Sequence, residues 1–180
     1  MTGPAGRIRH LEESLVVAAP ADVVFRLVGD PARMGSLSPE CSGVWVLRPR
    51  RRPGPLFIGF NRRGARRWFT VCRVLTHRPP AEFSFHVSIL GLSIARWTYR
   101  LERLGERGTR VTESWQDLRH GPGGTVTDLL GRRFAGTTPA QRVDANRHGM
   151  RTTLRRLKTL AESATPPPRD DVPRKRTGPS

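Results

Sequence analysis

Two neighbouring stretches decide the fold: residues 95–103 read ARWTYRLER and residues 109–117 read TRVTESWQD. Both alternate with period two between apolar and polar side chains, which is typical of antiparallel strands with one face buried and one in water. The stretch between them, LGERG, has the glycines of a turn. The sequence therefore predicts a β-hairpin, whose first strand buries Ala95, Trp97, Tyr99 and Leu101.

The second strand of this hairpin carries an unexpected residue. Parity places Glu113 on the buried face, between Val111 and Trp115. A buried, charged carboxylate is costly unless it is paired. Glu113 is therefore expected either to pair with an arginine near the sheet rim, the favoured interpretation, or to keep its proton. A raised pKa would suit a general acid or a hydrogen bond to a ligand. Glu13 shares the inward parity of the first predicted strand.

Outward from the hairpin, the same pattern predicts further strands and two short helices between the first two strands. The predicted strands are 10–18, 43–47, 56–62, 66–77, 82–89, 95–103 and 109–117, with a tight turn over 61–64. The predicted short helices are 22–28 and a turn through Met34. After a Gly/Pro break at 120–124, another short helix is expected to start with Thr125 as its N-cap and to run to Phe134.

The last predicted element is a long amphipathic helix. Thr138 and Gln141 have the spacing of a capping box, and Pro139 suits the first turn. Its apolar stripe, which includes one asparagine, is Val143, Asn146, Met150, Leu154, Leu157 and Ala161. We therefore predict an α+β helix-grip fold, in which a curved antiparallel sheet of six to seven strands wraps around the C-terminal helix and leaves a hollow. Residues 1–9 are expected to be flexible, 10–164 to form one ligand-binding domain, and 165–180 to be a disordered, basic, Pro-rich tail.

The chain is strongly basic, with a formal net charge of +17 in 180 residues. Only Lys158 and Lys175 are lysines, and arginines gather between residues 48 and 67. Such a surface can attract nucleic acid or another acidic partner. Because the arginines are scattered through every segment, a coding bias is the favoured interpretation. The candidates for an anion or nucleic-acid site are Arg62, Arg63, Arg66 and Arg67.

Other chemistry has little support in the sequence. The two cysteines, Cys41 and Cys72, have no spacing for a disulfide framework or zinc, and the five histidines lie in separate segments. No metal or cofactor is expected. No signal peptide or membrane-spanning stretch is recognised, so a cytoplasmic location is expected.

Several segments resemble the START/Bet v 1-like (SRPBCC) superfamily, in its branch of polyketide cyclases, dehydrases and lipid-transport proteins. The resemblance covers residues 10–162, and its segments are ESLVVAAP (13–20), VFRL (24–27), DPARM (30–34), SPE (38–40), WTYRL (97–101), TRVTE (109–113), NRHGM (146–150) and LRRLK (154–158). It implies a helix-grip fold around an apolar cavity, but no particular catalytic residue. Phe25 and Leu37 stand where relatives often carry Trp, which implies a different pocket mouth.

The function expected from the residues and the resemblance is binding of a small hydrophobic or aromatic, lipid- or polyketide-like ligand. Two alternatives stay open: a cyclase or dehydratase in which Glu113 moves a proton, and a module that binds RNA, a ribosomal surface or another acidic partner. Whether the chain is an enzyme, and its oligomeric state, are left open, with non-catalytic binding slightly favoured. The candidate ligand-binding residues are Trp97, Tyr99, Glu113, Trp115, Phe83, Phe85, Asn146 and Met150.

Overall fold

The computed structural model describes residues 8–47, 55–119, 121–130, 133, 136 and 138–165. The helices are α1 (Ala21–Val28), the 3-10 turn η1 (Pro31–Arg33), α2 (Met34–Leu37), α3 (Gly121–Leu130) and α4 (Pro139–Ser163). The strands are β1 (His10–Val17), β2 (Cys41–Leu47), β3 (Leu56–Arg63), β4 (Arg66–Arg78), β5 (Glu82–Ile89), β6 (Leu92–Leu104) and β7 (Gly108–Asp117).

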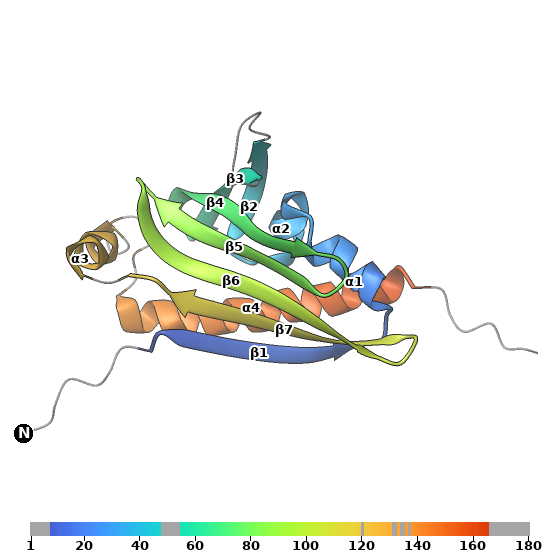
Figure 1. Ribbon diagram of the computed structural model, residues 1–180. Helices are drawn as coiled ribbons and strands as arrows, with labels where there is room; N and C mark the ends of the chain where they lie inside the picture. Colours follow the sequence, from blue (N-terminus) through green and yellow to red (C-terminus); the bar gives the residue numbers. More distant parts are fainter. Residues whose placement is uncertain are drawn as a thin grey trace, which may run out of the picture.

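The strands form one curved, seven-stranded antiparallel sheet in the order β1-β7-β6-β5-β4-β3-β2 (Figure 1). From β2 to β7 each strand pairs with its neighbour in sequence, and β1 closes the order beside β7. The hairpin predicted over residues 95–117 is β6–β7, in which Trp97 lies opposite Trp115 and Tyr99 opposite Glu113. The predicted fold class is confirmed.

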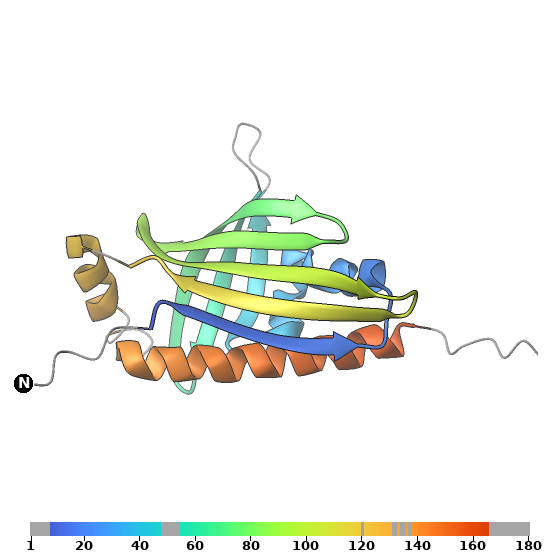
Figure 2. The same cartoon turned by 60° about the horizontal axis from the view of Figure 1, so that its bottom comes forward.

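The long helix α4 runs across one face of the sheet, below β1 and β7 in the view of Figure 2. We call this face the inner face and the opposite one the outer face. The predicted capping box is present: Gln141 N donates to Thr138 Oγ1 at 3.3 Å, and Thr138 N donates to Gln141 Oε1 at 3.0 Å. Two hydrogen bonds thus satisfy backbone and side-chain groups at the start of α4, which fixes where the helix begins.

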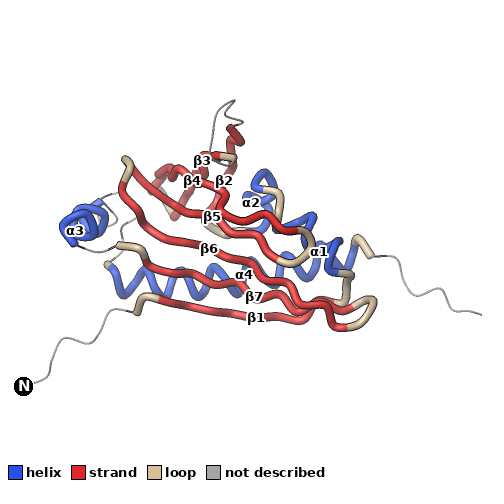
Figure 3. The backbone as a smooth tube through the Cα atoms, in the orientation of Figure 1, coloured by secondary structure: helices blue, strands red, loops and turns tan. Residues whose placement is uncertain are grey.

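The C-terminal half of α4, together with α1 and α2, closes one end of the inner face. Leu154, Leu157 and Ala161 of α4 are buried there, in one cluster with Phe83 of β5 and Leu37 of α2. Figure 3 shows the short helices beside this half of α4. Full burial of one such large apolar side chain contributes about 1.5–3 kcal/mol, so this end holds much of the core.

Two local predictions were wrong. The helix α3 begins at Gly121 and not after an N-cap at Thr125. Pro122 falls in its first turn, where the missing N–H has no helical partner to lose, so the Gly/Pro stretch starts the helix and does not interrupt it. The turn predicted over 61–64 is also shorter. Asn61 pairs with Trp68 within the β3–β4 ladder, and Gly64 turns the chain with a φ of 59°.

Several predictions concern residues outside the described ones. They include most of the N-terminal stretch, the first arginines of the basic stretch 48–67, the end of the predicted helix at Phe134 and the tail after residue 165. Arg9 is described, and it is attached to the sheet: its carbonyl accepts from Asp117 N at 2.8 Å. This hydrogen bond lies beside the end of β7, and the predicted domain boundaries stay predictions.

Candidate functional site

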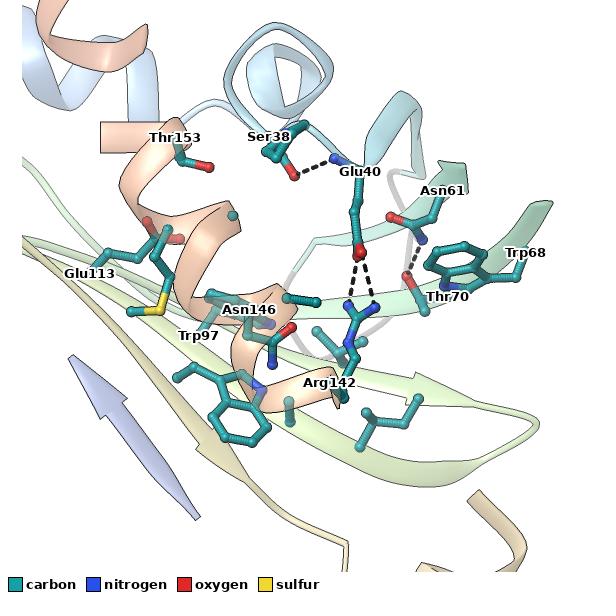
Figure 4. Close-up of a pocket in the computed structure, with 18 of the residues that line it drawn as sticks. Ser38, Glu40, Asn61, Trp68, Thr70, Trp97, Glu113, Arg142, Asn146 and Thr153 are labelled. Carbon is teal, nitrogen blue, oxygen red and sulfur yellow. Dashed lines mark hydrogen bonds and ion pairs between the residues drawn. The ribbon is translucent and has the colours of Figure 1, made fainter. Parts of the chain in front are cut away.

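A cavity of about 210 Å³ lies between the inner face and the N-terminal half of α4 (Figure 4). Its apolar wall comes mainly from β5 and β6, which contribute Val87, Ile89 and Ile94. The aromatic side chains of Trp97, Tyr99 and Trp115 also line it. A hollow with aromatic and aliphatic walls and a few polar groups is the usual form of a small-molecule site.

The most unusual polar group of the cavity is the carboxyl of Glu113. It is 2% exposed, and Tyr99 donates its hydroxyl proton to Glu113 Oε1 at 2.8 Å. The other oxygen, Oε2, has no hydrogen-bond partner. Burial raises the pKa of Glu113 to about 8, opposed by the Tyr99 hydrogen bond and assisted by the charge of Glu13. Glu113 is thus largely protonated at neutral pH.

The arginine ion pairs expected for Glu113 are formed by Glu13 instead. The two glutamates lie directly opposite each other on β1 and β7. Glu13 forms ion pairs with two arginines of α4, Arg151 (Nε to Oε2, 3.1 Å) and Arg147 (Nε to Oε1, 3.7 Å). The favoured prediction of an arginine ion pair for Glu113 is therefore wrong: Glu13 is the partly exposed carboxylate that both guanidinium groups can reach.

A second polar group lies at the side of the cavity formed by β2, β3 and the first turns of α4. Arg142 makes a two-pronged contact with Glu40, with Nη1 to Oε1 at 3.2 Å and Nη2 to Oε2 at 2.8 Å. The Arg142 guanidinium also lies 6.0 Å from the ring centre of Trp68. Figure 4 shows Arg142 beside Asn146 on α4, with its guanidinium directed to Glu40. This bidentate contact ties the start of α4 to the residue just before β2 with defined geometry.

Near α3, the cavity is bordered by a buried arginine, Arg119, that binds two carboxylates. Arg119 binds Asp117 through Nε at 2.8 Å and Nη2 at 3.1 Å, and it binds Asp128 of α3 through Nη1 at 3.0 Å. The two carboxylates compensate the charge of this 8% exposed side chain. The network fastens α3 to the end of β7.

The structure brings together six of the eight predicted ligand-binding residues. The six that line the cavity are Trp97, Tyr99, Glu113, Trp115, Asn146 and Met150. The side chain of Asn146 is 5% exposed and points into the pocket in Figure 4.

Phe83 and Phe85 do not line the cavity. They are on the inner face as predicted, but at the closed end, where Phe83 packs on His77 and Phe85 on Phe57. Strand parity identifies the face of a side chain but not its place under the helices. Phe25 and Leu37, expected to alter the pocket mouth, are also buried in the closed core.

The four candidate arginines of the anion site are divided between the two faces. Arg62 lies opposite Arg67 on the outer face, and Arg63 opposite Arg66 on the inner face. Arg63 approaches Glu40 at 4.0 Å, and Arg66 donates to the carbonyl of Arg133 at 3.0 Å. They do not form a single cluster.

Sequence reasoning missed the polar lining from distant segments, namely Ser38, Glu40, Asn61, Thr70, Arg142 and Thr153. Parity could have indicated two of them: Asn61 and Thr70 alternate with the outward Phe60 and Phe69 and therefore face inward. Among the described residues no group of three or more His, Cys, Asp or Glu is placed to hold a metal ion. Within the same part of the chain, no helix is long and apolar enough to cross a membrane.

Comparison with solved structures shows the same fold elsewhere. A START superfamily protein from Mycobacterium smegmatis is 15% identical, with a TM-score of 0.60 over 87% of this chain and 99% of that one. A polyketide-cyclase-like protein from Corynebacterium glutamicum is 27% identical, with a TM-score of 0.52 over 86% and 90%. The di-domain aromatase/cyclase (ARO/CYC) BexL, from the BE-7585A biosynthetic pathway, is 23% identical, with a TM-score of 0.59 over 89% of this chain and 48% of BexL. The chain thus spans about half the length of BexL.

The fold and hollow define a helix-grip protein of the SRPBCC type. Residues 9–162 match the profile of the family described as polyketide cyclase / dehydrase and lipid transport, and the chain belongs to this family. A search of curated proteins gives no match. The description of this family supports ligand binding or cyclase function in this fold.

Proposed function

We propose that the protein binds a small, mostly apolar, aromatic molecule in the cavity between the sheet and α4. The observation that carries this proposal is the carboxyl of Glu113, buried among aromatic side chains with Oε2 unpartnered. An unsatisfied buried polar atom costs about 1–3 kcal/mol. A ligand hydroxyl or carbonyl at Oε2 would remove this cost.

The lining defines the chemistry of this ligand further. Trp97 and Trp115 are cross-strand neighbours on the inner face, which offers an apolar surface to a flat ring. Because Glu113 is neutral at pH 7, it can donate to a carbonyl or accept from a hydroxyl. The ligand class is therefore a neutral ring system with at least one hydroxyl or carbonyl group, as in phenols and polyketides.

The test compares 1-naphthol with naphthalene, which lacks only the hydroxyl group. Calorimetric titration at pH 6.5 should show tighter binding of naphthol, by about tenfold for one hydrogen bond worth about 1.5 kcal/mol. Glu113→Leu should abolish this preference and keep naphthalene binding, whereas Glu113→Gln should retain part of it. Failure of both compounds to bind, or an unchanged preference in Glu113→Leu, would contradict the proposal.

The same carboxyl supports a second candidate function, an acid–base reaction of the cyclase or dehydratase type. A pKa of about 8 lets Glu113 exchange a proton near neutral pH. In a dehydration, ionised Glu113 would take the α-proton of a β-hydroxy ketone and return it to the leaving hydroxyl, giving an enone and water. The test is the ultraviolet absorbance of the enone formed from 4-hydroxy-4-phenylbutan-2-one. Glu113→Gln should form the enone no faster than buffer alone. Equal rates for wild type and Glu113→Gln would leave only the binding function.

A further inference from the structure

The outer face of β2, β3 and β4 carries three large aromatic side chains in water. Trp45 is 60% exposed, Phe60 43% and Phe69 48%. Phe60 and Phe69 lie directly opposite each other, and Trp45 is opposite Ile58, two residues before Phe60 on β3. We call these three residues the outer aromatic patch. Exposed aromatic side chains gathered on one sheet face can mark a binding surface.

Arginines flank this patch on the same face. Arg62 and Arg67 face each other one row beyond Phe60 and Phe69. Arg73 of β4 lies beyond the other side of the patch, opposite Leu56. The sequences of β2, β3 and β4 contain no aspartate or glutamate. The face is therefore both aromatic and positively charged, without a carboxylate from its own strands.

We propose that the outer face of β2–β4 binds single-stranded nucleic acid, with bases stacked on the outer aromatic patch and phosphates held by Arg62 and Arg67. Exposed aromatics on a sheet surface can stack successive bases, and neighbouring arginines bind the backbone. This site lies on the face opposite the cavity and does not depend on the ligand proposed for it.

The charge and position of the patch favour this occupant over others. In a symmetric pair of these faces, each would bring its arginine rows close to those of its partner, which opposes self-association of a chain with net charge +17. The aromatic side chains lie within strands, beside paired neighbours, and not at a loop tip that could enter a bilayer. A polyanion with flat rings matches both features.

The test is fluorescence anisotropy with labelled 12-nucleotide oligo(U), oligo(dT) and a 12-base-pair duplex, each at several NaCl concentrations. The full chain should prefer single strands. Phe60→Ala/Phe69→Ala should weaken single-strand binding about ten- to a hundredfold with an unchanged salt slope. Arg62→Gln/Arg67→Gln should reduce the slope of log K against log[salt] by about 1.4, since each contact to a single strand contributes about 0.7.

The matched control is Arg103→Gln/Arg155→Gln, which removes the same charge from two exposed positions on β6 and α4 and should leave the slope unchanged. Equal binding of duplex and single strand, unaffected by the phenylalanine pair, would overturn the proposal. A wild-type dimer that the phenylalanine variant no longer forms in sedimentation would also overturn it. The same holds if the phenylalanine variant no longer binds phosphatidylcholine vesicles with 30% phosphatidylserine but still binds the oligonucleotides. Naphthol binding by each variant reports separately on the cavity.

Discussion

The two halves of the inner face are covered by the same helix but differ in how they are filled. Under the C-terminal half of α4, Leu154, Leu157 and Ala161 join the side chains of α1 and α2 in a closed core. Under the N-terminal half, Ala145, Asn146 and Gly149 face the cavity. In this protein the sheet is closed where α1 and α2 add a second layer beside α4, and it stays hollow where α4 covers it with small residues such as Ala145 and Gly149.

Truncating a single side chain should lower the free energy of unfolding most in the closed half. Leu157 is fully buried, so Leu157→Ala should lower the free energy of unfolding by about 2–5 kcal/mol through lost burial and a new void. The matching change in the hollow half is Asn146→Ala. It removes no hydrogen bond within the described residues, so it should cost less than about 1 kcal/mol. Urea unfolding measures both. Similar losses for the two variants would remove the distinction between the halves.

A larger side chain should destabilise the closed half but not the hollow half. Ala161 is fully buried, and Ala161→Leu should cost about 1–3 kcal/mol because the closed core has no room. Ala145→Leu places the same atoms into the cavity and should leave stability within about 0.5 kcal/mol while it blocks naphthalene binding. Thermal unfolding and calorimetric titration are the measurements. If Ala145→Leu proved as destabilising as Ala161→Leu, the cavity would be filled in solution.

The pH dependence of stability should report on the ionisation of Glu113. The pKa of Glu113 is about 8 in the folded protein against 4.5 for the free group. Between these values the folded state holds more protons than the unfolded state, so stability falls as pH rises, at up to about 1.4 kcal/mol per pH unit. Above pH 8 this contribution is flat. Urea unfolding of wild type minus Glu113→Gln isolates the slope from other groups. A flat difference between pH 5 and 8 would mean that Glu113 is already ionised.

The smallest change in stability is expected at Gly149, where α4 passes Pro39. A Cβ built at Gly149 would lie 4.0 Å from Pro39 Cγ, an ordinary contact. Gly149→Ala should therefore gain about 0.5–1 kcal/mol from helix propensity. Thermal unfolding measures the gain, and Ala140→Gly, at an exposed position of the same helix, is the reverse control. A loss of stability in Gly149→Ala would indicate that α4 lies closer to Pro39 than this distance.

Much of the fold could be predicted because its determinants are local. Period-two patterns identify strands such as 95–103 without knowledge of their partners. The capping box at Thr138 and Gln141 fixes the start of α4 through groups three residues apart. Parity also placed Glu113 and Trp115 on the buried face, where both are found.

The site could be predicted only in part, because its details depend on contacts between distant segments. Nothing near Glu40 in sequence indicates that Arg142, on another element, will bind it. The choice of Arg147 and Arg151 between Glu13 and Glu113 depends on where α4 crosses β1. Phe83 and Trp97 have the same parity on neighbouring strands, yet only Trp97 lies beneath the hollow.

The register that sets Glu13 opposite Glu113 links the surface of the protein to its interior. Arg147 and Arg151 offset the charge of Glu13, which otherwise raises the proton affinity of Glu113. Neutralising these two arginines would make the internal acid still harder to ionise, although neither touches it. The ionisation of a group sealed from solvent is thus adjustable from the exposed side of a helix.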